Sequence, residues 1–203
     1  MLRAQRPRPY AESAVLRVVG ARFVRDGRDL AAPFSLELGA GQRARLEQPD
    51  ACGAMVAARL AAAIVKPTFG AVTVGDFDSR LQPAQAKRLV GFVPHCGFSG
   101  SEREFAREIG FRADVWNVER AAMQRDATEI LRALRHAGSC PDGYARALAL
   151  ALAPGVALAV LELAPEGAVD ALAALRPEVA VVATAVAADR FAAVAGALAE
   201  SAP

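Results

Sequence analysis

The chain has 203 residues, of which 54% are hydrophobic and only 6% aromatic, and its formal net charge at pH 7 is +2. This length suits one α/β domain with an aliphatic core, and so small a net charge argues against nucleic acid as a partner. The longest apolar run, residues 147–161, is interrupted by Pro154 and Gly155 and falls short of the roughly 20 residues that a membrane-spanning helix needs. The three cysteines form no metal-spaced pair and no secretory signal is visible, so we expect no metal site and a reduced, cytoplasmic setting.

The first part of the chain is predicted to alternate strands with two helices. Residues 1–12, which carry prolines and arginines, are expected to form a flexible tail, and residues 13–203 a single domain. Segments of alternating or continuous apolar residues between turns predict strands at residues 14–24, 34–38, 43–46, 71–74 and 89–93. Helices are predicted at residues 54–65 and 82–87.

Residues 98–140 differ from their surroundings, because they carry many charges and few strand signals. Ser101 and Glu104 have the spacing of a capping box, which predicts that a helix begins there. Residues 126–129 offer a second helix start of the same kind, and Gly138 offers a stop. We interpret this region as a helical insert.

The last part of the chain returns to alternating helices and strands. Helices are predicted at residues 145–153, 169–175 and 188–200, and strands at residues 156–161 and 179–183. Strands that alternate with helices favour a mainly parallel sheet covered by helices on both faces. The predicted fold class is therefore α/β.

The order and spacing of these segments resemble those of the ATP-binding subunits of ABC transporters, over roughly residues 14–195. The stretches that carry the resemblance are FSLELGAGQ at residues 34–42, KPTFG at 66–70, AVTVG at 71–75, GFVPH at 91–95, LAVL at 158–161 and VAVVAT at 179–184. The resemblance implies a P-loop NTPase-like fold, in which a mainly parallel sheet is joined by an antiparallel N-terminal β part and a helical subdomain. It also implies ATP and Mg²⁺ as ligands and ATP hydrolysis as the activity of the family.

The phosphate loop of this family reads G-x-x-x-x-G-K-[ST]. Its glycines let backbone N–H groups wrap the phosphates, its lysine reaches them and its hydroxyl holds Mg²⁺. The aligned stretch runs from Gln48 to Val56 and keeps only Gly53 of these residues. Ala54 stands in the place of the lysine and Met55 in the place of the hydroxyl. The sequence therefore predicts a remnant loop that has lost phosphate and metal binding.

Two further motifs of the resemblance have lost their functional side chains. His95 stands at the place of the family's Q-loop glutamine, and no second metal ligand is visible for it. Residues 140–144 align with the Leu-Ser-Gly-Gly-Gln signature and keep only Gly143. Pro141 brings no backbone N–H where the family has serine, and Asp142 would repel a phosphate.

The family's Walker B motif places Asp-Glu after an apolar strand, and two alignments of it remain open. If Pro165 is matched to the family's proline, Leu163 and Ala164 replace Asp and Glu. If the strand is matched instead, Glu162 takes the Asp place and Leu163 the Glu place. Both alignments lose the catalytic carboxylate.

The resemblance also specifies the D-loop, switch and adenine-stacking positions of the family. Asp170 matches the D-loop Asp, which lies at the dimer seam of the family, and Ala185 replaces the switch histidine. The adenine-stacking aromatic of the family falls at Arg25 or, with a slip of two residues, at Phe23.

These losses predict a catalytically degenerate ABC-type subunit at the inner face of the cell membrane, with no catalytic residues and no ATP or Mg²⁺ as cofactors. Its expected partners are a membrane permease subunit and a second ATP-binding-cassette subunit. Phe105, Phe111 and Trp116 are candidate docking anchors, since aromatics dominate interface hot spots, and Trp116 also suits an ordinary core position. Two alternatives remain open: a subunit that still binds or hydrolyses ATP with unusual residues, and a cytoplasmic regulator that binds another ligand.

Overall fold

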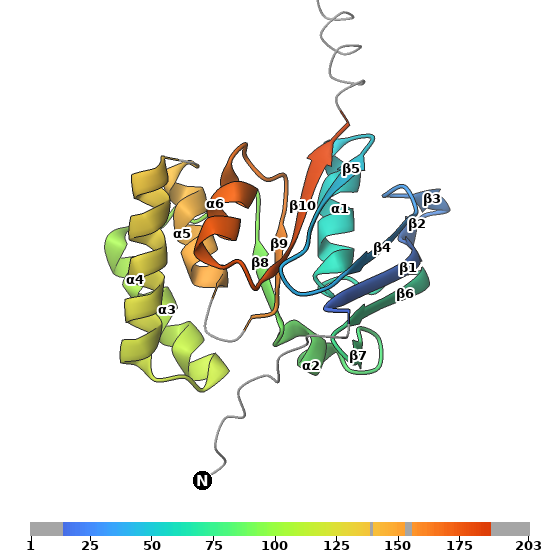
Figure 1. The fold of residues 1–203 in the computed structure, drawn as a ribbon. Helices are drawn as coiled ribbons and strands as arrows, with labels where there is room; N and C mark the ends of the chain where they lie inside the picture. Colours follow the sequence, from blue (N-terminus) through green and yellow to red (C-terminus); the bar gives the residue numbers. More distant parts are fainter. Residues whose placement is uncertain (1–13, 139, 153–155, 188–203) are drawn as a thin grey trace, which may run out of the picture.

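The computed structural model describes residues 14–138, 140–152 and 156–187, which form two sheets with helices between and beside them (Figure 1). The tail predicted at residues 1–12 and the helix predicted at residues 188–200 lie outside the described residues. In the part that is described, no helix combines the length and the apolar character needed to cross a membrane. One parallel and one antiparallel sheet, together with the helices, confirm the predicted fold class.

The antiparallel sheet contains the N-terminal strands in the order β4-β1-β6-β7. These strands are β1 (Leu16–Arg22), β4 (Phe34–Leu38), β6 (Phe69–Val74) and β7 (Phe77–Asp78), and a separate hairpin pairs β2 (Val24–Arg25) with β3 (Arg28–Asp29). The strand predicted at residues 14–24 is thus divided. The division follows a bulge, where Gly20 has a φ of +52° and the pairing of β1 shifts on both of its edges.

The parallel sheet has the order β5-β10-β9-β8. Its strands are β5 (Arg43–Gln48), β8 (Val90–Val93), β9 (Leu158–Leu161) and β10 (Ala180–Val186), and the short helix α2 (Pro83–Lys87) leads into β8. Helix α1 (Ala51–Ala61) lies between the two sheets, while α5 (Asp142–Ala151) and α6 (Ala168–Leu175) cover the opposite face of the parallel sheet (Figure 1). The side chains of a strand alternate between its two faces. Val182 therefore packs into the core between the two sheets, and Val181 packs into the core formed with α5 and α6.

Residues 98–140 contain α3 (Glu102–Trp116) and α4 (Arg120–Ala137), which pack on each other and on α5. We call α3, α4, α5 and α6, which share one core, the helical part. The predicted capping box is confirmed, because Ser101 Oγ accepts from the N–H of Glu104 and the Glu104 carboxylate accepts from the N–H of Ser101. Gly138 ends α4 in the left-handed conformation, as predicted.

The second helix start, predicted at residues 126–129, is wrong, because α4 already begins at Arg120. The buried residues of α4 follow the helical period from its first turn onward, and they are Met123, Ala127, Ile130, Leu131 and Leu134. This apolar stripe packs on α3 and α5, so tertiary packing extends the helix beyond the local capping signal.

Candidate functional site

The resemblance places the phosphate loop in the connection between β5 and α1. This connection ends in a side-chain cap at the start of α1. Asp50 is the N-cap residue of α1, and its Oδ1 accepts a hydrogen bond of 2.7 Å from the N–H of Gly53. The N–H of Ala54 donates to the backbone carbonyl of Asp50 at 3.0 Å. Because the cap satisfies an N–H group of the first turn, α1 begins at Ala51, earlier than the helix predicted at residues 54–65.

The other residues of this remnant loop form hydrogen bonds or pack within the chain. Gln48 is buried at the end of β5, and its Oε1 accepts from the N–H of Ala32 at 2.7 Å. Met55 is half-buried, and Val56 is half-buried against the core between the two sheets. Ala54 is fully buried, so position 54, where the family has its lysine, is enclosed by the protein.

A buried carboxylate follows the parallel sheet. Glu162 comes directly after β9, as in the alignment that matches the strand, and it is fully buried. Its Oε1 accepts from Arg59 Nε at 3.0 Å, and its Oε2 accepts from the backbone N–H of His95 at 3.1 Å. The ring nitrogen Nδ1 of His95 lies 2.8 Å from the same Oε2. We call these three residues, which come from α1, the end of β9 and the loop after β8, the Glu162 cluster.

The chemistry of the Glu162 cluster follows from its burial. An ionised carboxyl group in a protein interior requires hydrogen bonds and an opposite charge. Arg59, which belongs to no motif of the sequence, supplies that charge, because a guanidinium group stays protonated in proteins. Since an ionised carboxylate only accepts hydrogen bonds, the ring of His95 donates from Nδ1. Among the residues that the structure describes, no three His, Cys, Asp or Glu side chains are placed to hold a metal ion.

The remaining Walker B, D-loop and switch positions lie around the end of β10. Leu163 has a left-handed φ of +46°, and its N–H donates to Oγ1 of the buried Thr184 at 3.1 Å. Ala164, Asp170 and Ala185 line a cavity of ≈ 610 Å³. Asp170 is exposed in the first turn of α6 and is the only one of these five residues with a titratable side chain.

Of the two positions considered for an adenine-stacking aromatic, Phe23 precedes the β2–β3 hairpin and Arg25 belongs to its first strand. The ring of Phe23 is half-buried and packs against the core between the sheets. Arg25 is exposed, and its Nε lies 3.8 Å from the carboxylate of Asp26. The ring of Phe23 therefore already has packing partners within the chain.

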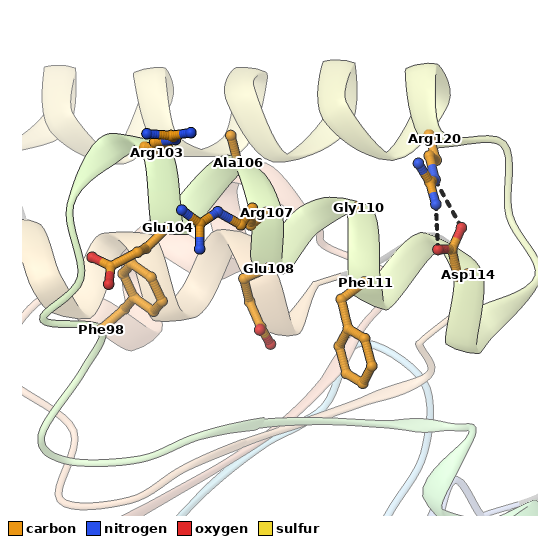
Figure 2. Close-up of a pocket in the computed structure, with 10 residues that line it drawn as sticks. All are labelled: Phe98, Arg103, Glu104, Ala106, Arg107, Glu108, Gly110, Phe111, Asp114 and Arg120. Atoms are coloured by element: carbon orange, nitrogen blue, oxygen red, sulfur yellow. Dashed lines mark hydrogen bonds and ion pairs between the residues drawn. The ribbon is translucent and has the colours of Figure 1, made fainter.

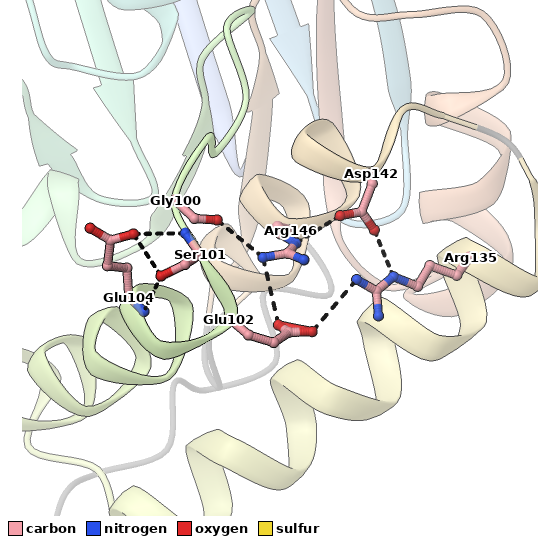
Figure 3. A network of polar contacts seen from close by, with 7 residues as sticks. All are labelled: Gly100, Ser101, Glu102, Glu104, Arg135, Asp142 and Arg146. Carbon is pink, nitrogen blue, oxygen red and sulfur yellow. Dashed lines mark hydrogen bonds and ion pairs between the residues drawn. The ribbon is translucent and has the colours of Figure 1, made fainter.

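Helix α5, which begins in the signature region, starts with an acidic residue whose charge is already paired. Pro141 is its N-cap, and Asp142 lies in its first turn. The Asp142 carboxylate accepts from Arg135 Nε at 2.6 Å and from Arg146 Nε at 2.8 Å. Glu102 of α3 forms ion pairs with both arginines, which ties α3, α4 and α5 together (Figure 3). The hydrogen bond from Arg135, with a further contribution from Arg146, holds the pKa of Asp142 below its ordinary value.

The loop after β8 contacts the first turn of α5 directly. The N–H of Phe98 donates to the carbonyl oxygen of Gly143 at 2.8 Å. Gly97 has a φ of +66°, and a Cβ added to it would lie 2.7 Å from the carbonyl carbon of Gly143. Since His95 of the same loop binds Glu162, this short segment connects the buried carboxylate to α5.

Tyr144, at the last position of the signature alignment, is buried, and its hydroxyl has no hydrogen-bond partner among the described residues. Burial raises the pKa of this hydroxyl, with smaller contributions from Cys140 and Glu162, so the group stays protonated at neutral pH. A buried hydroxyl without a partner destabilises the folded state. We therefore expect Tyr144→Phe to raise the free energy of unfolding, measured in urea, by about 1 kcal/mol. A decrease of that size would show that the hydroxyl is hydrogen-bonded.

The three candidate docking anchors differ in exposure. Phe105 is only 5% exposed and packs edge-on against Phe98, with ring centroids 5.6 Å apart. Phe105 therefore does not suit the predicted role of docking anchor, because its ring belongs to the core of the helical part. Trp116 is half-buried at the last residue of α3. Phe111, by contrast, is 63% exposed.

Phe111 lies in a groove of ≈ 940 Å³ that runs along α3. We call it the α3 groove, and it is lined by Phe98, Arg103, Glu104, Ala106, Arg107, Glu108, Gly110, Phe111, Asp114 and Arg120. Figure 2 shows the rings of Phe98 and Phe111 directed to the same side of α3, with Glu108 between them. The groove therefore combines two aromatic rings with charged residues of both signs.

No protein-family model matches the sequence, and no curated protein matches it either. Among solved structures, the chain is similar to an ATP binding subunit of an ABC transporter, with 14% identity and a TM-score of 0.62 over 85% of this chain and 79% of that chain. It is also similar to a bacterial Atm1-family ABC exporter with ATP bound, with 16% identity and a TM-score of 0.59 over 85% of this chain and 34% of that chain. The chain thus spans most of the subunit but only about a third of the exporter chain. Together with the two sheets and the helical part, these likenesses show that the chain has the nucleotide-binding-domain fold of ABC transporters.

Proposed function

We propose that this chain is a catalytically degenerate ABC-type subunit that serves as a structural, docking or regulatory component of an ABC transporter-like membrane complex. The observation that carries the proposal is the Asp50 cap, because its carboxylate already accepts from the N–H of Gly53. In a phosphate loop, such an N–H group at the start of a helix binds the anion. A phosphate would have to displace this hydrogen bond and approach a like charge.

The residues around the cap do not fit ATP and Mg²⁺, the ligands that the fold implies. Ala54 supplies no ammonium group for the phosphates, and Met55 supplies no hydroxyl for a metal ion. A metal ion at Glu162 would meet the positive charge of Arg59, whose Nε lies 3.0 Å from Oε1. In this proposal the fold is retained for its shape, and no hydrolytic step is assigned to the chain.

The proposed docking surface is the α3 groove. Phe111 and Val115, which is 59% exposed, lie four residues apart on α3, the spacing at which side chains share one face of a helix. The groove itself combines two aromatic rings with three arginines, and aromatic residues and arginine are enriched at protein–protein interfaces. We propose that a segment of a membrane subunit docks here at the inner face of the membrane, and that a second cassette subunit belongs to the same complex.

Titration with a fluorescent ATP analogue in the presence of Mg²⁺ tests the loss of nucleotide binding. We expect no saturable binding at submillimolar nucleotide, because the anion site at α1 is capped by Asp50. An intact ABC ATP-binding subunit, titrated in parallel, serves as the positive control. Micromolar binding accompanied by turnover would overturn the proposal and favour an ATPase with unusual residues.

Restoring the lysine of the phosphate loop alone should not create an ATPase. We expect phosphate release by Ala54→Lys to stay at the background rate, because a metal-binding hydroxyl and a water-activating carboxylate are still missing at Met55 and Leu163. Since Ala54 is fully buried, the circular dichroism spectrum of the variant must first show that it is folded. Measurable turnover in this single variant would mean that the site is wrongly aligned.

A further inference from the structure

Glu162 is the only acidic side chain that is buried among the described residues. The groups that contact its two oxygens come from segments far apart in the sequence, Arg59 on α1 and His95 in the loop after β8. Glu162 itself is anchored by its backbone, whose N–H donates to the carbonyl of Val93 at 2.9 Å. The carboxylate therefore sits where α1, β8 and β9 meet.

Of the two side chains that contact the Glu162 carboxylate, only Arg59 carries a permanent positive charge. His95 contributes hydrogen bonds to Oε2 through its backbone N–H and its ring, whereas the guanidinium group of Arg59 remains charged. A buried carboxylate without an opposite charge is strongly unfavourable, so this charge decides whether Glu162 is tolerated in its ionised form.

We infer that Arg59 is an internal counter-ion, which balances the buried Glu162 and holds α1, β9 and the loop after β8 together without a bound metal ion. The arginine is well placed for this role, because its Nε makes the contact at 3.0 Å while its side chain remains 44% exposed. The inference concerns what stabilises this end of the parallel sheet, and it does not depend on the proposed docking role.

The same contacts position the loop that reaches the helical part. His95 binds Glu162 Oε2 through both its backbone N–H and its ring, and three residues later Phe98 donates to Gly143 of α5. A carboxylate fixed by Arg59 therefore fixes the start of this loop. Loss of Arg59 should loosen the loop and its contact with α5 as well as the end of β9.

A double-mutant cycle tests the pairing of Arg59 with Glu162. Unfolding in urea at pH 7 is measured for the full chain, for Arg59→Met, for Glu162→Gln and for the double variant. We expect Arg59→Met to lower the folding equilibrium constant about 30-fold or more, because it leaves a buried charge without its partner. In the Glu162→Gln background the same substitution should change the constant by about threefold or less, since no charge remains to be balanced.

The exposed pair Arg45–Glu47, whose Nε and Oε1 are 3.2 Å apart, provides the matched control. The cycle of Arg45→Met and Glu47→Gln should change the constant by about threefold or less, as is typical of surface ion pairs. Equal losses from Arg59→Met in the presence and absence of the Glu162 charge would overturn the inference. If Arg59→Met does not fold, the double variant decides: a folded double variant supports the pairing, and an unfolded one contradicts it.

Divalent ions provide a second readout. The urea midpoint of the unchanged chain should be the same in the presence of millimolar MgCl₂ and of EDTA, because Arg59 already balances Glu162. A midpoint that rises with MgCl₂ in the unchanged chain, but not in Glu162→Gln, would show that a metal ion balances the carboxylate and would overturn the inference. Neither result depends on nucleotide binding, so the titration with the ATP analogue tests the loss of nucleotide binding separately.

Discussion

Replacing Gly97 with alanine should lower the free energy of unfolding by about 3 kcal/mol or more. At a φ of +66°, alanine is disfavoured by about 1–2 kcal/mol relative to glycine. Its Cβ would also lie 2.7 Å from the carbonyl carbon of Gly143 and 2.9 Å from the backbone N of Tyr144. Because these are backbone atoms of a packed helix, they cannot move aside as a flexible side chain would.

Urea unfolding followed by circular dichroism measures this loss, and Gly110 provides the matched control. Gly110 lies inside α3, and a Cβ added there meets nothing within 4 Å. Gly110→Ala should therefore raise the free energy of unfolding by about 0.5–1 kcal/mol, because glycine weakens a helix interior. A loss of less than about 1 kcal/mol in Gly97→Ala would mean that the loop after β8 does not pack closely on α5.

Replacing Phe111 with glutamate should weaken association with the membrane subunit about 30-fold or more, the effect expected of an interface hot spot. The ring is 63% exposed on α3, so the substitution leaves the core of the helical part intact. The tagged chain is to be purified from its source cells, and the polytopic membrane protein that accompanies it is identified by mass spectrometry. The affinity of each variant for that protein is then measured directly.

Leu81→Glu is the control for Phe111→Glu. Leu81 is 83% exposed and lies in the turn between β7 and α2, outside the helical part. Its substitution adds the same charge to the surface but should leave the affinity unchanged. Equal weakening by both variants would indicate a general effect of charge, and no weakening by Phe111→Glu would remove the α3 groove from the interface.

Much of the architecture follows from local patterns in the sequence. The alternation in residues 34–38 predicted β4 with the correct bounds, and the capping box at Ser101 predicted the start of α3. The start of α4 does not follow from a local pattern, because its first turn carries no side-chain cap and is held by packing of the apolar stripe that begins at Met123. Helix α1 begins three residues before its predicted start at residue 54, because Asp50 is its N-cap.

The candidate site was only partly predictable. The losses at Ala54, Met55 and Leu163 are visible in the sequence, because the resemblance specifies which side chains those positions should carry. The Glu162 cluster is not visible there, because Arg59 and Glu162 are 103 residues apart and no local pattern relates them. An acidic residue at the end of an apolar strand was a signal that a buried charge needed a partner, but it did not indicate which arginine supplies it.

The pairing within the parallel sheet also determines when the protein can fold during its synthesis. Within the described chain, β5 pairs only with β10, and Arg43 lies beside Val181 in their register. The antiparallel sheet can form once residues up to β7 have left the ribosome, but β5 has no neighbour until β10 has emerged as well. A nascent chain therefore carries an open strand edge through most of its translation, and fragments that end before β10 should be prone to aggregation.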